Sequence, residues 1–267
     1  MPRADDPDHP GAVARHDGPR RVGCRGGGRA GHTPVVGTQQ RSTGSASYGR
    51  DTVEFARAFT FFDAVYAFAL TLLAVNLDPP PPRDWTSLSK LLASGLEWQF
   101  FGFIVSFVVI AVFWRVNHRI GAGFRALSQG TIVANLVAIA FVVLIPFSTQ
   151  GISDQGTADQ PLAVAIYAVN ISAAVLAQAA MYSVARHDGV LADPLPRRAD
   201  RVNLIDTLTT PAIFLASIPI AYAWGAGAGR WTWAVLIVVA PVSGRIASRR
   251  VARIVAEDAA AGGIRSE

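Results

Sequence analysis

The sequence predicts an all-α, polytopic membrane protein with six transmembrane helices. Of its 267 residues, 51% are hydrophobic and 16% are charged, whereas about a quarter of the residues in soluble domains are charged. Apolar runs of about twenty residues recur, which is the length that crosses a hydrocarbon core of about 30 Å. The net charge of +5 comes mainly from arginines between these runs. This placement favours cytoplasmic loops of a membrane protein over a nucleic-acid-binding surface.

The apolar runs define the six predicted spans in order. Asp78 and the prolines 79–82 stop the first span, because proline cannot continue a helix. A polar cluster at 115–119 closes the second, and the motif IPFSTQ closes the third. The predicted spans are residues 57–77, 97–117, 131–150, 161–185, 203–224 and 230–248. Together they form a predicted transmembrane domain over residues 51–253, with no soluble domain inserted.

The two ends of the chain are predicted to be cytoplasmic tails. Residues 1–50 are rich in Arg, Gly, Pro, Asp and Ser and have no apolar periodicity, so we expect a disordered basic tail. Residues 254–267 are expected to be a short second tail. Arginines gather in the N-terminal tail, after the second and fourth spans and at the C-terminus. By the positive-inside rule both termini are then cytoplasmic, which requires an even number of spans.

A carboxylate inside the first span is the first candidate functional feature. Asp63 costs a few kcal/mol there unless it is paired or hydrated. Its partner must come from another helix, since Arg57 is neither three nor four residues away. The second span ends with three side chains that can donate a hydrogen bond at about this depth: Trp114, Asn117 and His118. Such a network either locks the two helices together or touches a transported species.

A stripe of large apolar side chains is the second candidate feature. Phe61, Phe68, Leu72 and Val75 recur at spacings of seven, four and three along the first span. The stripe either contacts lipid or another helix, or it forms a constriction. In the second case several copies of this helix surround an axis, and the apolar ring restricts passage by dewetting.

Catalytic and metal-binding motifs are absent from the sequence. It contains no H-E-x-x-H, G-x-S-x-G or P-loop motif. The single cysteine, Cys24, excludes a disulfide or a cysteine metal site within one chain. The potassium filter motif T-V-G-Y-G and the spaced arginines of a voltage sensor are also missing. We therefore expect neither an enzyme nor a bound cofactor or metal.

Two motifs resemble the transmembrane-protein-175 family of potassium channels. Arg57-x-x-x-Phe61-Phe62-Asp63, followed by 67–73 (AFALTLL), is similar to the family signature R-x-x-x-F-S-D and A-I-A-x-T-L-L. The end of the second span, Trp114-x-x-x-His118, resembles the family pattern W-x-x-x-H. The segment 135–147 resembles the third helix of the family. The resemblance extends over roughly residues 54–250.

The resemblance implies a potassium-favouring cation channel without a pore loop, with K⁺ as the permeant ion. Prokaryotic members are homotetramers of six-helix subunits in the plasma membrane, and the first helix of each subunit lines the pore. Carried onto this chain, the constriction falls at Phe68, Leu72 and Val75, with Thr71 as a nearby polar contributor. Asp63 projects about 140° away from Phe68 at 100° per residue, which favours a helix-locking role. The expected partners are the lipid bilayer, three further copies of the chain and monovalent cations, with no nucleic acid.

Two positions depart from the family pattern, and two other function classes remain alternatives. Phe62 stands where the motif has serine, and Phe68 is aromatic where an aliphatic residue is usual. One alternative is a proton-coupled secondary transporter that uses Asp63 and His118 as its relay. The other is a non-conducting membrane scaffold or a membrane-embedded enzyme.

Overall fold

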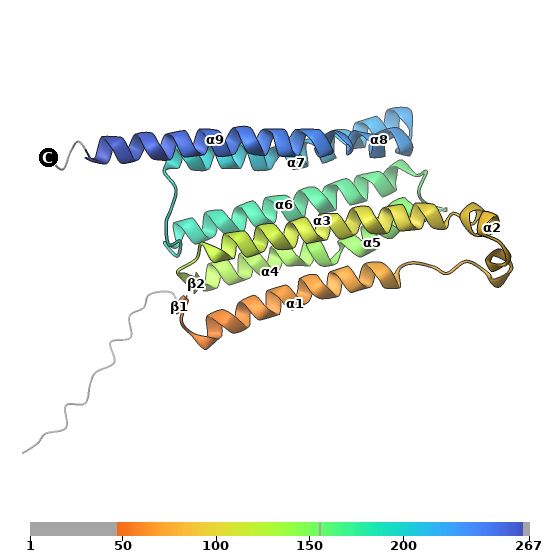
Figure 1. Cartoon of the computed structure of the whole chain (residues 1–267), viewed down its shortest axis with the longest axis horizontal. Helices are drawn as coiled ribbons and strands as arrows, with labels where there is room; N and C mark the ends of the chain where they lie inside the picture. The colour runs from red at the N-terminus through yellow and green to blue at the C-terminus, as the bar shows by residue number, and fades with distance from the viewer. Residues whose placement is uncertain (1–46, 155, 264–267) are drawn as a thin grey trace, which may run out of the picture. The chain divides into compact units, whose positions relative to one another are not determined.

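The computed structural model describes residues 47–154 and 156–263, and this part of the chain is almost entirely helical (Figure 1). The described residues also contain a two-stranded antiparallel sheet, and turns and loops connect the elements. The elements in chain order are β1 (Ser47–Gly49), α1 (Val53–Val75), the 3₁₀ helix η1 (Pro82–Thr86), α2 (Leu88–Ala93), α3 (Leu96–Ala122), β2 (Ala126–Ser128), α4 (Gln129–Val143), α5 (Ile145–Ser153), α6 (Pro161–His187), α7 (Arg197–Trp224), α8 (Ala226–Thr232) and α9 (Val235–Gly263).

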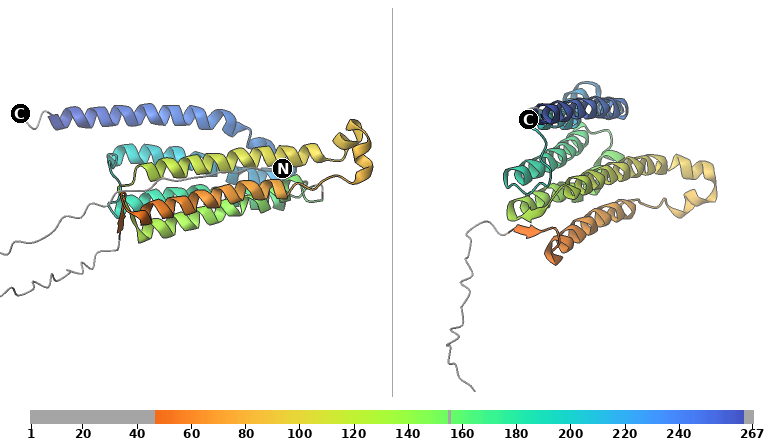
Figure 2. Two further views of the ribbon diagram at one scale, coloured as in Figure 1. Left: turned by 60° about the horizontal axis from the view of Figure 1, so that its bottom comes forward. Right: turned by 60° about the vertical axis from the view of Figure 1, so that its left-hand side comes forward.

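The long helices run side by side, and α1 lies at one edge of them (Figures 1 and 2). Helix α1 packs against α3, α4 and α5, while α6 packs against α4, α5 and α7. Helix α9 packs against α7 and α8. The main core therefore lies between α1 and α6, where Tyr66, Ile110, Val142 and Tyr167 are all buried.

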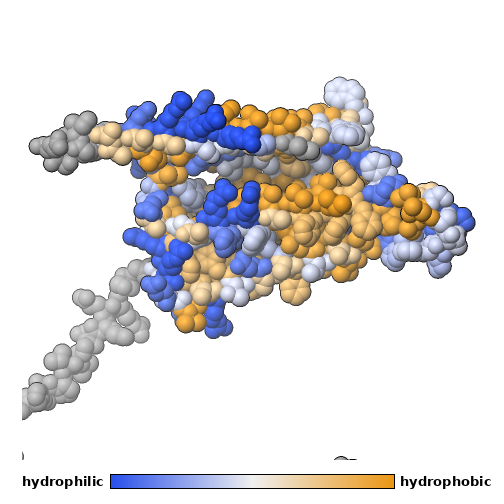
Figure 3. All heavy atoms as spheres, viewed as in Figure 1, coloured by the Kyte–Doolittle hydropathy of each residue, from blue (hydrophilic) through white to orange (hydrophobic). Residues whose placement is uncertain are grey.

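Five helical segments are long and apolar enough to cross a membrane: Val53–Val75, Leu96–Ala122, Gln129–Ser153, Pro161–His187 and Arg197–Trp224. They overlap the first five predicted spans, so the protein is a multi-pass, mostly helical membrane protein. Figure 3 shows the matching surface, an apolar belt over the helices with hydrophilic residues toward the β1–β2 end and at the opposite, α2 end. Helix α9 is long enough but is not among the five, because its middle third carries four arginines: Arg245, Arg249, Arg250 and Arg253.

The structure departs from the sequence prediction in the third span, in the sixth span and in the C-terminal tail. The third span is two helices, since the ring of Pro146 interrupts the hydrogen-bond ladder between α4 and α5. The predicted sixth span, 230–248, contains the turn at 233–234 that separates α8 from α9. Helix α9 then continues to Gly263, through residues expected to form a tail.

The predicted N-terminal tail falls mostly outside the described residues. Residues 1–46 are not described, but β1 lies within the segment 1–50 that was expected to be disordered. Its backbone pairs with β2, from Ser47 opposite Ser128 to Gly49 opposite Ala126. This pairing satisfies the backbone polar groups of a segment that has no apolar pattern of its own.

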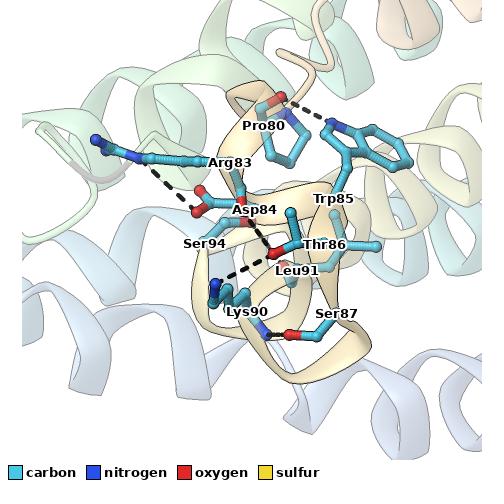
Figure 4. A network of polar contacts seen from close by, with 9 residues as sticks. All are labelled: Pro80, Arg83, Asp84, Trp85, Thr86, Ser87, Lys90, Leu91 and Ser94. Atoms are coloured by element: carbon cyan, nitrogen blue, oxygen red, sulfur yellow. Dashed lines mark hydrogen bonds and ion pairs between the residues drawn. The ribbon is translucent and has the colours of Figure 1, made fainter.

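A compact cap connects α1 to α3 at the end of the helices opposite the small sheet (Figure 4). The indole of Trp85 donates to the carbonyl of Pro80 at 2.9 Å, and Lys90 Nζ donates to Thr86 Oγ1 at 3.1 Å. The side chain of Ser87 caps α2 by accepting from the Lys90 amide. These local bonds fold the proline-rich connection into η1 and α2.

Candidate functional site

Helix α1 has one buried face and one exposed face. It begins where the Thr52 side chain accepts from the Phe55 amide, and it ends at Asn76, ahead of the proline run. The buried face consists of Phe55, Phe62, Tyr66, Ala69 and Leu73. The predicted constriction residues lie on the other face, where Phe68 is 70%, Leu72 39% and Val75 74% exposed. Thr71 is exposed beside them and donates to the Phe68 carbonyl.

The structure pairs Asp63 with Trp114. The indole Nε1 of Trp114 donates to Asp63 Oδ1 at 2.9 Å, which links α1 to α3. His118 lies one turn further along α3, with its ring centroid 5.7 Å from the ring centroid of Trp114. His118 thus contacts the ring of Trp114, whereas the hydrogen bond to Asp63 comes from the Trp114 indole.

Asn117 does not join the expected hydrogen-bond network around Asp63, and Arg57 and Phe61 lie apart from it, on the exposed side of α1. Asn117 is buried on the face of α3 that carries Phe113, and its Oδ1 has no hydrogen-bond partner within the described chain. Arg57 and Phe61 are exposed on α1. Of the three donors expected around Asp63, the structure therefore brings only Trp114 into hydrogen-bond contact.

Sequence reasoning missed a second tether between the same helices. Gln178 of α6 is buried and its Nε2 donates to the Tyr66 hydroxyl at 3.1 Å and to the Phe113 carbonyl at 3.0 Å. One amide thereby joins α6 to both α1 and α3, one turn beyond Asp63. The available signal was Gln178 itself, a strongly polar side chain within the apolar span 161–185, where such residues usually bond across helices.

Phe62, which replaces the motif serine, is part of the core. Only 1% of its surface is exposed, and its ring makes an edge contact with Phe59 at 5.9 Å. Phe59 in turn fills the space beside Gly121 of α3, where a Cβ would come within 2.1 Å of the Phe59 ring. Aromatic packing, and not a hydroxyl, therefore fills this part of the contact between α1 and α3.

Both ends of α1 are tied to neighbouring elements. At the sheet end, Arg50 donates to the carbonyls of Ala122 at 2.8 Å and Phe124 at 3.0 Å. At the other end, Asn76 Nδ2 donates to the carbonyl of Pro146 at 3.2 Å. Together with the Asp63 and Tyr66 bonds, these contacts hold α1 at three levels along its length.

The sheet end also contains an electrostatic contact between two loops. Asp188, just beyond α6, accepts a hydrogen bond from Ser128 of β2 and contacts His187. The Ser128 hydrogen bond, followed by the His187 contact, lowers the pKa of the Asp188 carboxyl from its ordinary value. Arg125 donates to the Gly189 carbonyl beside it. The loops after α3 and α6 are thus joined at the sheet end of the helices.

A second buried polar cluster joins α3, α5 and α6. Thr149 Oγ1 donates to Ser106 Oγ at 2.6 Å, and Ser106 lies 3.3 Å from the Tyr167 hydroxyl. Asn170 Nδ2 donates to Ser148 Oγ at 3.3 Å. These bonds hold α3 and α5, two of the helices against which α1 packs, to α6. No group of three or more His, Cys, Asp or Glu side chains that could hold a metal occurs within residues 47–154 and 156–263.

Comparison with known proteins shows which helical membrane proteins this chain resembles. The fold is similar to that of the crystal structure of a lysosomal potassium-selective channel TMEM175 homolog from Chamaesiphon minutus, with a TM-score of 0.58. That match covers 73% of this chain and 99% of the other at 21% identity. Residues 57–146 match the model of the endosomal/lysosomal potassium channel TMEM175 family. The resemblance to the TMEM175 family is thereby confirmed, over the segment that carries α1, α3 and α4.

Two bacterial relatives match the same region. A potassium channel of Chryseobacterium sp. (strain P1-3) is 26% identical over 96 residues, which cover 36% of this chain and 47% of the relative. A potassium channel of Streptomyces collinus is 27% identical over 106 residues, which cover 38% of this chain and 48% of the relative. The chain thus spans about half the length of each potassium channel in these matches.

The Gln178 tether generates the first prediction. Changing Gln178→Leu leaves the buried Tyr66 hydroxyl without its donor, which should lower the free energy of unfolding by about 1–2 kcal/mol. Thermal unfolding in detergent measures the change. Exposed Gln150→Leu is the control and should have little effect.

A double variant separates the hydrogen bond from the shape of the side chain. Adding Tyr66→Phe to Gln178→Leu removes both polar partners, and this should recover part of the lost stability. A single Gln178→Leu variant as stable as the native chain would contradict the proposed tether.

Proposed function

We propose that the protein is a cation channel, a potassium-favouring leak channel whose pore is lined by α1 of each subunit. The observation that carries the proposal is the exposed stripe of Phe68, Leu72 and Val75 on a helix at the edge of the subunit. The family match begins at Arg57 of this helix. The names of the relatives, potassium channels, support K⁺ as the permeant ion.

The proposed channel is a homotetramer in a prokaryotic plasma membrane. In this arrangement four copies of α1 face a common axis with their exposed stripes, and no pore loop is needed. The α8–α9 segment supplies a sixth span, so that both termini are cytoplasmic, as the loop arginines favour. Large apolar side chains around a narrow axis hinder ion passage because water leaves the constriction.

Within the proposed subunit, polar contacts hold α1 while its apolar face lines the path. The Asp63–Trp114 bond lies on the side of α1 that meets α3, away from Phe68. In the same region of α3, Asn117 is buried in the helix packing, and the ring of His118 packs against the ring of Trp114. Arg57 and Phe61 lie toward the exposed face, at the entrance of the proposed path.

Truncation of the stripe tests the pore assignment. Phe68→Ala and Leu72→Ala remove side-chain volume from the constriction, so K⁺ flux into liposomes should rise several-fold and the preference for K⁺ over Na⁺ should fall. Leu162→Ala, a 59% exposed leucine on α6, is the control and should leave both quantities unchanged. Native-like flux and selectivity in both α1 variants would exclude this stripe from the pore.

Asp63→Asn distinguishes the channel from a proton-coupled transporter. The amide oxygen still accepts from Trp114 but cannot carry a proton at neutral pH. A channel held by this bond should keep K⁺ flux within about twofold and should show no pH-gradient coupling. Flux measured with and without a pH gradient gives the answer. Loss of pH-driven transport in the variant, from a native protein that shows it, would establish the transporter instead.

A further inference from the structure

A deep cleft lies between two groups of helices, away from α1. Its walls come from α3 and α6 on one side and from α7 and α9 on the other, and its volume is about 2470 Å³. Helix α9 packs against α7 and α8 and not closely against α3. The space between α9 and α3 therefore stays open. Figure 3 shows the surface hollowed between α9 and the helices below it.

The middle of the cleft is apolar. Val108 and Val112 of α3, Val175 of α6, Phe214 of α7 and Leu236 of α9 all line it. From Phe101 to Arg119, α3 borders the cleft over about 27 Å at 1.5 Å per residue. This length approaches the thickness of a hydrocarbon core, about 30 Å, so each half of the cleft matches the acyl chains of one leaflet.

Unpaired positive charge gathers at one end of the cleft. Arg119, Arg201, Arg245 and Arg249 line this end and are exposed, and none of them is in an ion pair within the described chain. At the opposite end, the one lining arginine, Arg230, is occupied by backbone carbonyls and Asp159. The cleft therefore has an apolar middle and a free positive charge at one end only.

The acidic side chains at the basic end indicate which polar groups the ligand carries. Asp200 is already paired with Arg186, and Asp193 is exposed at the rim. Asp206 lies about 7.5 Å along α7 from Arg201, and its Oδ1 has no donor within the described residues. A headgroup that carries hydroxyl donors beside its phosphate can satisfy this oxygen.

We propose that the cleft binds an anionic phospholipid with hydroxyl groups on its headgroup, of the phosphatidylglycerol type. The phosphate contacts the arginines of α3, α7 and α9, a headgroup hydroxyl donates to Asp206, and the acyl chains lie along the valines of α3. Basic pockets between transmembrane helices recognise lipid headgroups in this way. The lipid fills the space that α9 leaves between itself and α3.

Lipid retention by the purified full-length chain tests the proposal. Dioleoylphosphatidylglycerol or dioleoylphosphatidylcholine is added in detergent, and bound lipid is counted by native mass spectrometry. Arg245→Gln with Arg249→Gln should weaken phosphatidylglycerol binding roughly 10- to 30-fold, at about fivefold per arginine. The matched control, Arg250→Gln with Arg253→Gln, changes exposed arginines of the same helix that do not line the cleft and should bind normally.

A space-filling variant tests whether the lipid lies inside the cleft. Ala240→Trp on α9 places a large ring in the apolar part and should reduce phosphatidylglycerol binding without loss of folded protein in size-exclusion chromatography. Equal binding of the two lipids, or full binding by Ala240→Trp, would overturn the proposal. So would a cross-link between co-expressed Val112→Cys and Ala240→Cys chains in a Cys24→Ser background, since a neighbouring copy would then fill the cleft. None of these readouts depends on ion flux.

Discussion

The hydrogen bond from Gln178 to Tyr66 is the constraint on which the placement of α1 depends. It joins α6, near the middle of the subunit, to a helix at its edge, and the same amide also bonds to α3. In a membrane there is no strong hydrophobic force between helices, so packing and hydrogen bonds decide how one helix is rotated against another. With Tyr66 fixed inward, Phe68 and Val75 must face outward because the turn of the helix allows nothing else.

The remaining polar contacts of α1 hold the helix in the same orientation. Arg50 at the sheet end and the Asp63–Trp114 bond in the middle connect α1 to α3, and Asn76 at the far end connects it to α5. None of these polar groups lies on the stripe of Phe68, Leu72 and Val75. The proposed division within one helix, with polar contacts on one side and an apolar path on the other, follows from this arrangement.

The sequence predicted the local features well and the long-range ones less well. The apolar length of the spans and the stop at the proline run located α1, α3 and α6 to within a few residues, and Asp63 pointed to a partner on α3. The Gln178–Tyr66 bond joins residues 112 positions apart, so only the packed helices bring it about. Asn117 was misplaced because packing turns its face of α3 inward, with Phe113. The turn at 233–234 contains neither glycine nor proline, so the sequence did not predict a break in the sixth span there.

Cysteine accessibility along α1 tests most directly whether the exposed face lines an ion path. In a Cys24→Ser background, Phe68→Cys, Leu72→Cys and Val75→Cys should react with a charged, membrane-impermeant thiol reagent, and the reaction should block K⁺ flux. Ala69→Cys and Leu73→Cys, on the face that Tyr66 and Gln178 turn inward, should not react. Protection of the three stripe positions, with flux unchanged by the reagent, would show that this face meets lipid and would contradict the account.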